Sequence, residues 1–290
     1  MTIAPPPPGP PRRLVYLGTP GLAVPPLQAL VASGFEVALV VTRPDKRRGR
    51  GTGLSPSPVK AAALELGLPV SHELDDVLDA GADLGVVVAY GRIIPMSVLT
   101  VVPMVNLHFS LLPRWRGAAP VERAILAGDD RTGVDLMVVE EGLDTGGIYA
   151  RAELPIGPDD TLEELRDRLV AAGTDLLVGA LHAGLGEAHP QEGEPTYAAK
   201  IDPAELEVDW SQPAVAIHRL VRVGGAWTTH DGRRLKLWRT RVPPAGDGPR
   251  VPAGDGPVEL VEVQPEGRAR MAATAWAHGA RWQPGAPLGS

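Results

Sequence analysis

An asparagine and a histidine lie two positions apart at the end of a short apolar run, at Asn106 and His108. The run from Met104 to His108 has the composition of a buried strand, and side chains two residues apart project from the same face of a strand. An amide and an imidazole on one face can donate hydrogen bonds to one point, as the stabilisation of a developing oxyanion requires. Taken alone, such a pair is more often a set of structural polar groups whose hydrogen bonds are satisfied.

A glycine-flanked acid, Asp144, follows the next apolar strand in the segment GLDTGG, residues 142–147. An aspartate in such a segment is commonly an ordinary turn residue. It can equally orient a histidine or accept a proton from an attacking nucleophile. Ligands of open α/β sheets bind beyond the carboxyl ends of the strands, so we interpret Asn106, His108 and Asp144 together as one catalytic group.

Several other chemistries find no support in the sequence. The first turn after a strand, Gly18-Thr19-Pro20-Gly21, lacks the G-x-G-x-x-G pattern, and no phosphate-binding G-x-x-x-x-G-K-[ST] segment is present, so dinucleotide and ATP cofactors are not expected. The chain has no cysteine, which excludes a cysteine nucleophile and thiolate metal sites. The seven histidines are scattered, and we therefore expect no metal.

The elements that must position these residues alternate between apolar strands and helices. Strands are predicted at 14–17, 35–41, 84–89, 104–108 and 134–139, and helices at 22–32, 58–66, 119–127 and 162–181. The last helix opens with Thr161-x-x-Glu164, a capping-box pattern. Apolar strands separated by helices predict an α/β fold with a Rossmann-like, doubly wound parallel sheet.

The composition of the sequence changes after the last of these helices, where residues 186–196 are rich in glycine, proline and acidic residues. We expect a disordered proline-rich tail at 1–13, a catalytic domain at 14–185, a linker at 186–205 and a smaller domain at 206–290. A short helix at 213–223 precedes strands at 234–238 and 258–263, which predicts a β-rich, barrel-like second domain. Residues 243–257 almost repeat the word PAGDGP and are interpreted as a flexible loop.

The net charge of −7 hides an asymmetry. Residues 1–205 carry 17 basic and 27 acidic side chains, whereas residues 206–290 carry 11 and 8. Within the acidic part, five basic residues crowd into a short segment, which is either a solvated loop or a contact for a polyanion. They are Arg43, Lys46, Arg47, Arg48 and Arg50. No run approaches the roughly 18 to 20 apolar residues of a membrane span, so a soluble, cytoplasmic protein is expected.

Longer motifs carry a family resemblance. The word NLHFSLLPRWRGAAP, residues 106–120, followed by GLDTG from Gly142, resembles the fingerprint of the folate-dependent formyltransferases. The form RWRGAAP closely resembles the branch of that family that formylates methionyl-tRNA. Further matching motifs are LGTP (17–20), SPSPVK (55–60), TYA (196–198), DWS (209–211) and QPEG (264–267). The resemblance therefore extends over nearly the whole chain.

The resemblance implies roles for particular residues. Asn106, His108 and Asp144 would form the catalytic trio. The folate pocket would include Ser110, Leu111, Leu112 and Pro113. It also implies 10-formyltetrahydrofolate as formyl donor, no metal, and initiator methionyl-tRNA as acceptor. The basic segment at 43–50 would contact the tRNA acceptor arm, and residues 206–290 would form an accessory tRNA-binding domain.

The chain departs from the family pattern at three places. Asp135 stands where the family usually has Thr or Ser. The segment VGGAW, residues 223–227, replaces a proline-containing turn, and residues 239–257 are short and simple where further strands are expected. One interpretation is that the C-terminal domain is a reduced form of the family's.

Two alternatives stay open at this stage. The first is a formyltransferase that acts on an amino-sugar nucleotide or on glycinamide ribonucleotide, because the trio recognises the formyl donor rather than the acceptor. The basic segment and the basic C-terminal part favour the tRNA acceptor over these small molecules. The second is a non-catalytic RNA-binding or folate-binding protein, against which the presence of all three polar residues argues.

Overall fold

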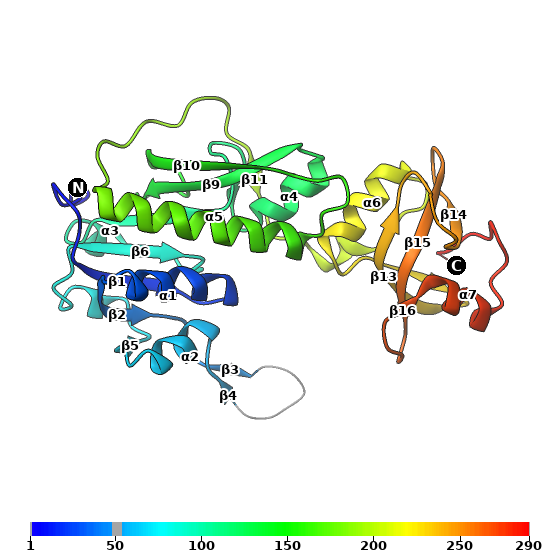
Figure 1. The fold of residues 1–290 in the computed structure, drawn as a ribbon, viewed down its shortest axis with the longest axis horizontal. Coiled ribbons are helices and arrows are strands. Elements are labelled where there is room, and N and C mark those ends of the chain that lie inside the picture. Colours follow the sequence, from blue (N-terminus) through cyan, green and yellow to red (C-terminus); the bar gives the residue numbers. More distant parts are fainter. Residues whose placement is uncertain (1, 48–53, 290) are drawn as a thin grey trace. The chain divides into compact units, whose positions relative to one another are not determined.

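The computed structural model describes residues 2–47 and 54–289 (Figure 1). The chain forms two compact units. Unit 1 comprises Met1–Pro120, Arg131–Leu154 and Arg166–Ala198, and unit 2 comprises Val121–Asp130, Pro155–Leu165 and Ala199–Ser290. Unlike the continuous segments expected from the sequence, unit 2 includes two short segments from the first part of the chain. Within the described residues no helix is long and apolar enough to cross a membrane.

Unit 1 is built on a seven-stranded sheet with the order β10-β9-β7-β6-β1-β2-β5. The strands are β1 (Arg13–Gly18), β2 (Glu36–Val41), β5 (Val70–Ser71), β6 (Leu84–Val88), β7 (Met104–His108), β9 (Arg131–Val138) and β10 (Ile148–Pro155). The five from β7 to β5 pair in parallel, and β9 pairs antiparallel with β7. Every residue of β6 is buried, as expected for a strand covered on both faces. The predicted α/β sheet is confirmed.

Helices pack on this sheet through apolar faces. They are α1 (Val24–Ala32), α2 (Pro58–Glu65), α3 (Met96–Leu99) and, for most of its length, α5 (Leu162–Ala183), with short 3₁₀ turns at Gly21–Ala23 and Asp75–Val77. In α5, Leu169, Leu177 and Leu181 recur at helical spacing and are fully buried. Gly173 lies on the same face, where an added Cβ would come within 3.1 Å of the Leu107 side chain, so α5 approaches β7 closely.

The N-terminal segment differs from the free tail that its prolines predicted. The Ala4 N–H donates to the Leu99 carbonyl at 2.8 Å, and Ile3 packs against an apolar cluster that includes Leu99. The backbone N–H groups of Arg12 and Arg13 both donate to Oδ2 of Asp83, at 2.8 and 2.9 Å. These contacts hold the segment against unit 1, and β1 begins at Arg13.

Two small pairs of strands complete unit 1. The strand β3 (Lys46–Arg47) pairs antiparallel with β4 (Leu54–Ser55), and β8 (Arg116–Gly117) pairs parallel with β11 (Tyr197–Ala198). The second pair joins the segment after the predicted catalytic strand to residues expected to be a linker. The predicted linker is therefore partly structured.

Unit 2 is β-rich, as predicted. Its antiparallel sheet has the order β12-β13-β15-β14, and β16 also pairs with β15. The strands are β12 (Trp227–His230), β13 (Arg233–Arg241), β14 (Arg250–Pro252), β15 (Pro257–Pro265) and β16 (Met271–Ala272), and the helical elements are most of α4 (Pro120–Ala127), a 3₁₀ turn at Pro203–Leu206, α6 (Ala214–Val223) and α7 (Ala273–Ala280). Buried residues of α6, β13 and β15 form one apolar core, together with Trp276.

The segment 243–257 is not the flexible loop that its repeated glycines and prolines predicted. It contains β14, and the carboxylate of Glu259 accepts the N–H groups of Ala245 and Gly246 at 2.8 Å and of Gly248 at 3.2 Å. A Cβ on Gly248 would lie 2.2 Å from the Leu260 carbonyl, so glycine is required for this close approach. The first copy of the repeated PAGDGP segment therefore surrounds the buried Glu259 carboxylate with backbone N–H groups.

We expect Glu259→Gln to destabilise unit 2 by about 2 kcal/mol near neutral pH, the usual contribution of hydrogen bonds to a charged group. Burial alone would raise the pKa of Glu259, but the three N–H groups and Arg241 outweigh it and lower this pKa from 4.5. The stabilisation is therefore complete above that ordinary pKa and is lost as pH falls through the lowered one. Urea unfolding across a pH series measures this, with Glu262→Gln on the same strand as control. Equal unfolding free energies for both variants would contradict the assignment.

Candidate active site

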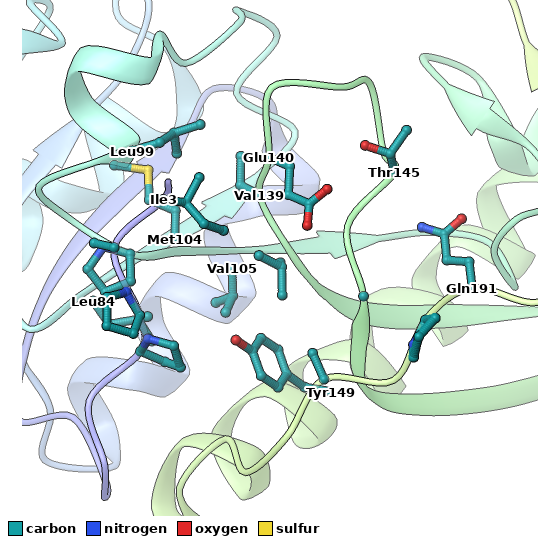
Figure 2. A pocket seen from close by; sticks show the side chains of 18 of the residues that line it. Ile3, Leu84, Leu99, Met104, Val105, Val139, Glu140, Thr145, Tyr149 and Gln191 are labelled. Carbon is teal, nitrogen blue, oxygen red and sulfur yellow. The ribbon is translucent and has the colours of Figure 1, made fainter. Parts of the chain in front are cut away.

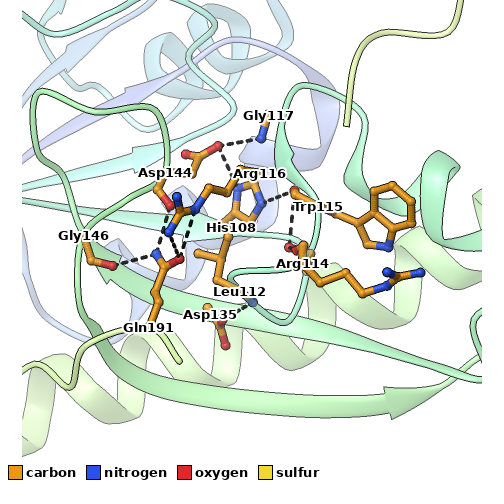
Figure 3. Close-up of polar contacts among 11 residues, drawn as sticks. His108, Leu112, Arg114, Trp115, Arg116, Gly117, Asp135, Asp144, Gly146 and Gln191 are labelled. Atoms are coloured by element: carbon orange, nitrogen blue, oxygen red, sulfur yellow. Dashed lines mark hydrogen bonds and ion pairs between the residues drawn. The ribbon is translucent and has the colours of Figure 1, made fainter. Parts of the chain in front are cut away.

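The structure brings two of the predicted catalytic residues together (Figure 3). His108, the last residue of β7, is 5% exposed, and its Nδ1 lies 3.7 Å from Oδ2 of Asp144. Asp144 reaches it from the loop that follows β9, with a φ of 52° that aspartate tolerates better than most residues. Asn106 lies two residues before His108 on the same face of β7 and is half-buried.

A network that the sequence did not predict holds the Asp144 loop. Oδ2 of Asp144 accepts the Gly117 N–H at 2.8 Å. The Gln191 amide donates to the carbonyls of Asp144 and Gly146, at 2.9 and 2.8 Å, and its own oxygen accepts two bonds from the Arg116 guanidinium. Gln191 lies in the segment 186–196, where composition alone gives no sign of such a contact. The Asp144 loop is thus held by Gly117 through the aspartate side chain and by Gln191 through the loop backbone.

The hydrogen-bond partner of His108 shows which ring nitrogen carries a proton. Nε2 lies 3.0 Å from the carbonyl oxygen of Trp115. A carbonyl can only accept a hydrogen bond, so Nε2 carries a proton in this arrangement. Nδ1 faces Asp144 at a distance beyond that of a direct hydrogen bond. The two ring nitrogens therefore face different partners.

The residues expected in a folate pocket form a compact turn after β7. Ser110 is fully buried and its hydroxyl donates to the Arg114 carbonyl at 2.7 Å. Leu112 is 2% exposed, and a cis peptide bond joins it to Pro113. Pro113 is also buried, and Leu111 is half-buried. Three of these four side chains are therefore packed in the interior of the protein rather than exposed on the turn.

A cavity of about 510 Å³ lies in unit 1 beside the Asp144 loop (Figure 2). One wall carries the polar residues Glu140, Thr145 and Gln191, and another is apolar. The labelled apolar side chains are Ile3, Leu84, Leu99, Met104, Val105 and Val139, with Tyr149 beside them. The volume is within the range of roughly 300 to 1,000 Å³ that is typical of small-molecule sites. A mainly apolar ligand with a few polar groups fits such a lining.

Of the basic residues predicted to contact tRNA, the structure describes Arg43, Lys46 and the backbone of Arg47. Lys46 is exposed on β3, and Nη1 of Arg43 donates to the Gly91 carbonyl at 3.3 Å. Arg48 and Arg50 lie outside the described residues, and Arg47 is described only by its place in β3. Among the described side chains, no group of three or more His, Asp or Glu is arranged to hold a metal ion.

Both parts of the chain match models of one enzyme class. Residues 12–181 match the formyl transferase family, and residues 200–281 match the formyl transferase C-terminal domain. The chain is 44% identical to the methionyl-tRNA formyltransferase of Heliobacterium modesticaldum over 96% of its own length and all of that protein. It is 46% identical to that of Roseobacter denitrificans, over 94% and 97% of the two lengths. The chain belongs to the formyl transferase family, in the branch of the methionyl-tRNA formyltransferases.

Solved structures with other names share the fold. An N-formyltransferase from Helicobacter canadensis, in complex with folinic acid and dTDP-3-aminofucose, has a TM-score of 0.67 at 18% identity, over 86% of this chain and 98% of its own. HypX from Aquifex aeolicus, in complex with tetrahydrofolic acid, has a TM-score of 0.65 at 16% identity, over 96% of this chain and 49% of its own. At these identities the likeness concerns the fold alone.

We expect Gln191→Glu to lower the turnover of formyl transfer about tenfold, because small displacements of a reacting group are costly. The substituted side chain keeps the oxygen that Arg116 contacts but loses the amide N–H groups that donate to the Asp144 loop. Steady-state kinetics measure the effect, and Gln283→Glu, at an exposed position in unit 2, is the control. Turnover equal to that of the control would show that the loop does not need Gln191.

Proposed function

We propose that this chain transfers the formyl group of 10-formyltetrahydrofolate to the α-amino group of initiator methionyl-tRNA, in the cytoplasm. The observation that carries the proposal is the 44 to 46% identity to methionyl-tRNA formyltransferases over nearly the full length of both chains. A phosphoribosylglycinamide formyltransferase from Bacillus halodurans aligns with only 59% of this chain. An N-formyltransferase bound to dTDP-3-aminofucose covers 86% of this chain but at only 18% identity, so the much higher identity to methionyl-tRNA formyltransferases is what disfavours small-molecule acceptors.

The trio supplies what acyl transfer to an amine requires. The neutral amine attacks the formyl carbon, the carbonyl oxygen becomes an oxyanion, and the bond from that carbon to folate N10 then breaks. Asn106 donates a hydrogen bond to the oxyanion, and the Nε2 proton of His108, which points at the Trp115 carbonyl before substrate binds, is shared with the oxyanion. An α-amino group has a pKa of roughly 8, so much of it is protonated near neutrality, and a base is needed. Asp144 accepts that proton, directly or through water, and a proton reaches N10 as tetrahydrofolate leaves.

The cavity beside the Asp144 loop supports a reduced folate as donor. Its volume of about 510 Å³ and its apolar wall suit a flat heterocycle and an aromatic ring, and Glu140, Thr145 and Gln191 offer polar contacts. Two proteins of the same fold have tetrahydrofolic acid or folinic acid bound. The turn Ser110–Pro113 does not line this cavity, and in this proposal the formyl group extends from the cavity toward His108.

Charge supports the nucleic-acid acceptor. In a chain of net charge −7, the basic residues gather at 43–50 and in residues 206–290, where 11 basic side chains outnumber 8 acidic ones. Lys and Arg side chains neutralise phosphates and release counterions on binding. We assign Arg43, Lys46, Arg47, Arg48 and Arg50 to contacts with the acceptor arm, and the C-terminal unit to additional contacts with the same tRNA.

Removing one oxyanion donor, by Asn106→Ala or His108→Ala, is expected to lower turnover by about a hundred- to a thousand-fold. Asp144→Asn, which is nearly isosteric but removes the base, should abolish most activity while tetrahydrofolate still binds. Radiolabelled formyl transfer to charged initiator tRNA gives the rates, and calorimetry with tetrahydrofolate gives binding.

Wild-type turnover in both alanine variants would show that the trio is assigned wrongly. If Asp144→Asn lost folate binding and its bound fraction turned over normally, Asp144 would line the pocket without acting in the reaction.

The acceptor contacts predict a salt effect. Lys46→Ala combined with Arg47→Ala should raise the Michaelis constant for charged tRNA and reduce its salt dependence, by a log-log slope of roughly 0.7 to 0.9 for each phosphate that is no longer neutralised. Affinity for tetrahydrofolate should not change. Filter binding of tRNA across a salt series measures both, with Arg12→Ala combined with Arg131→Ala, at two exposed basic positions of unit 1, as a charge-matched control. Affinities and slopes equal to the control would remove β3 from tRNA recognition.

A further inference from the structure

An ion pair between a buried carboxylate and a more exposed arginine joins β9 to β10 beside the proposed active site. Asp135 has no solvent exposure, and its two oxygens accept hydrogen bonds at 2.7 Å from Nε and Nη2 of Arg151. Asp135 is paired directly with His108 across the antiparallel β7–β9 ladder. Residues opposite each other in such a ladder project from the same face of the sheet. The ion pair and His108 therefore occupy one face.

The same pair forms hydrogen bonds with both backbone polar groups of Leu112. Oδ2 of Asp135 accepts the Leu112 N–H at 2.8 Å, and Nη2 of Arg151 donates to the Leu112 carbonyl at 2.7 Å. The neighbouring Leu111 packs onto β9 at Gly133, where an added Cβ would lie 2.4 Å from the Leu111 side chain. Both polar groups of one peptide residue are thus fixed by one carboxylate and one guanidinium.

From Leu112 the turn leads directly to the carbonyl that contacts His108. The Arg114 N–H donates to the Leu111 carbonyl at 3.1 Å, and the Ser110 hydroxyl donates to the Arg114 carbonyl. Trp115 has a φ of 66°, a left-handed conformation that a residue with a side chain keeps only where its surroundings impose it. In this conformation its carbonyl oxygen meets Nε2 of His108 at 3.0 Å.

We propose that Asp135 and Arg151 are positioning residues for His108. By fixing the turn 110–115 they direct the Trp115 carbonyl at Nε2, which keeps a proton on that nitrogen and leaves Nδ1 toward Asp144. Neither residue touches the substrates. The inference rests on the proposed function, in which His108 binds the formyl oxygen, and it assigns the orientation of the ring to an ion pair outside the trio.

Two variants separate positioning from simple stability. Arg151→Met leaves Asp135 as an unpaired buried carboxylate, so its Tm should fall. Adding Asp135→Asn removes that charge, and Tm should recover, whereas the Leu112 carbonyl still lacks its guanidinium donor. In both variants kcat should fall roughly ten- to a hundred-fold with both Michaelis constants within about twofold of wild type, the pattern of a misplaced reacting group. Calorimetry should still give one tetrahydrofolate per chain, which excludes an inactive fraction.

The histidine ring itself gives a direct readout. In protein labelled with ¹⁵N-histidine, NMR distinguishes the ring tautomers, and the His108 signals are those missing from His108→Gln. Wild type should show a protonated Nε2, and both Arg151 variants a mixture of tautomers. Arg131→Met is the matched control, because Arg131 pairs with Glu153 between the same two strands but in solvent. It should keep both kcat and the tautomer of wild type.

A double variant with wild-type kcat and a wild-type His108 tautomer would overturn the inference. So would a loss of kcat matched by Arg131→Met or by a reduced tetrahydrofolate stoichiometry. A wild-type protein that transferred no formyl group to methionyl-tRNA would refute the proposed function instead, and the tautomer comparison would still decide whether the ion pair orients His108.

Discussion

The proposed site depends on one carboxylate oxygen. Oδ2 of Asp144 accepts the Gly117 N–H and is the atom that faces Nδ1 of His108. Because Gly117 lies in the segment after β7 and Asp144 in the loop after β9, this oxygen ties together the two segments that carry the chemistry. The sheet alone does not bring them together, since β9 is antiparallel to β7 and ends beside Val105, away from His108. The loop has to return, and the Gly117 N–H and Gln191 hold it there.

The polar groups at and beside the proposed site are buried and therefore need hydrogen-bond partners. His108 is 5% exposed and Asp135 fully buried, and a polar group out of water is costly unless it is hydrogen-bonded. Backbone atoms supply part of these contacts: the Trp115 carbonyl contacts His108, the Gly117 N–H binds Asp144, and the Leu112 N–H binds Asp135, which also accepts two hydrogen bonds from Arg151. Backbone partners cannot rotate away as side chains can. His108 is therefore held in one orientation before any substrate arrives, which is a condition for effective electrostatic stabilisation.

What the sequence predicted well depends on local patterns. The strand Met104–His108 was predicted with its observed bounds, and the Thr161–Glu164 capping box is present at the start of α5. Contacts between distant segments were not predictable in this way. Asp135 stood out only as a departure from the family pattern, because its partner Arg151 lies on β10, a strand that was not predicted. Gln191 likewise lies in a segment that composition marked as a linker, and the Glu259 carboxylate binds a segment that composition marked as a loop.

Specificity for the acceptor must lie outside the trio. An N-formyltransferase from Helicobacter canadensis and HypX share this fold at 16 to 18% identity, although their names and ligands differ. In the proposed mechanism, the oxyanion donors recognise the transferred formyl group and not the amine that receives it. A large polyanionic acceptor needs further surface with positive charge. In the proposed function, the basic segment around β3 and the net positive C-terminal part would meet that need, separate from the acidic remainder of the first 205 residues.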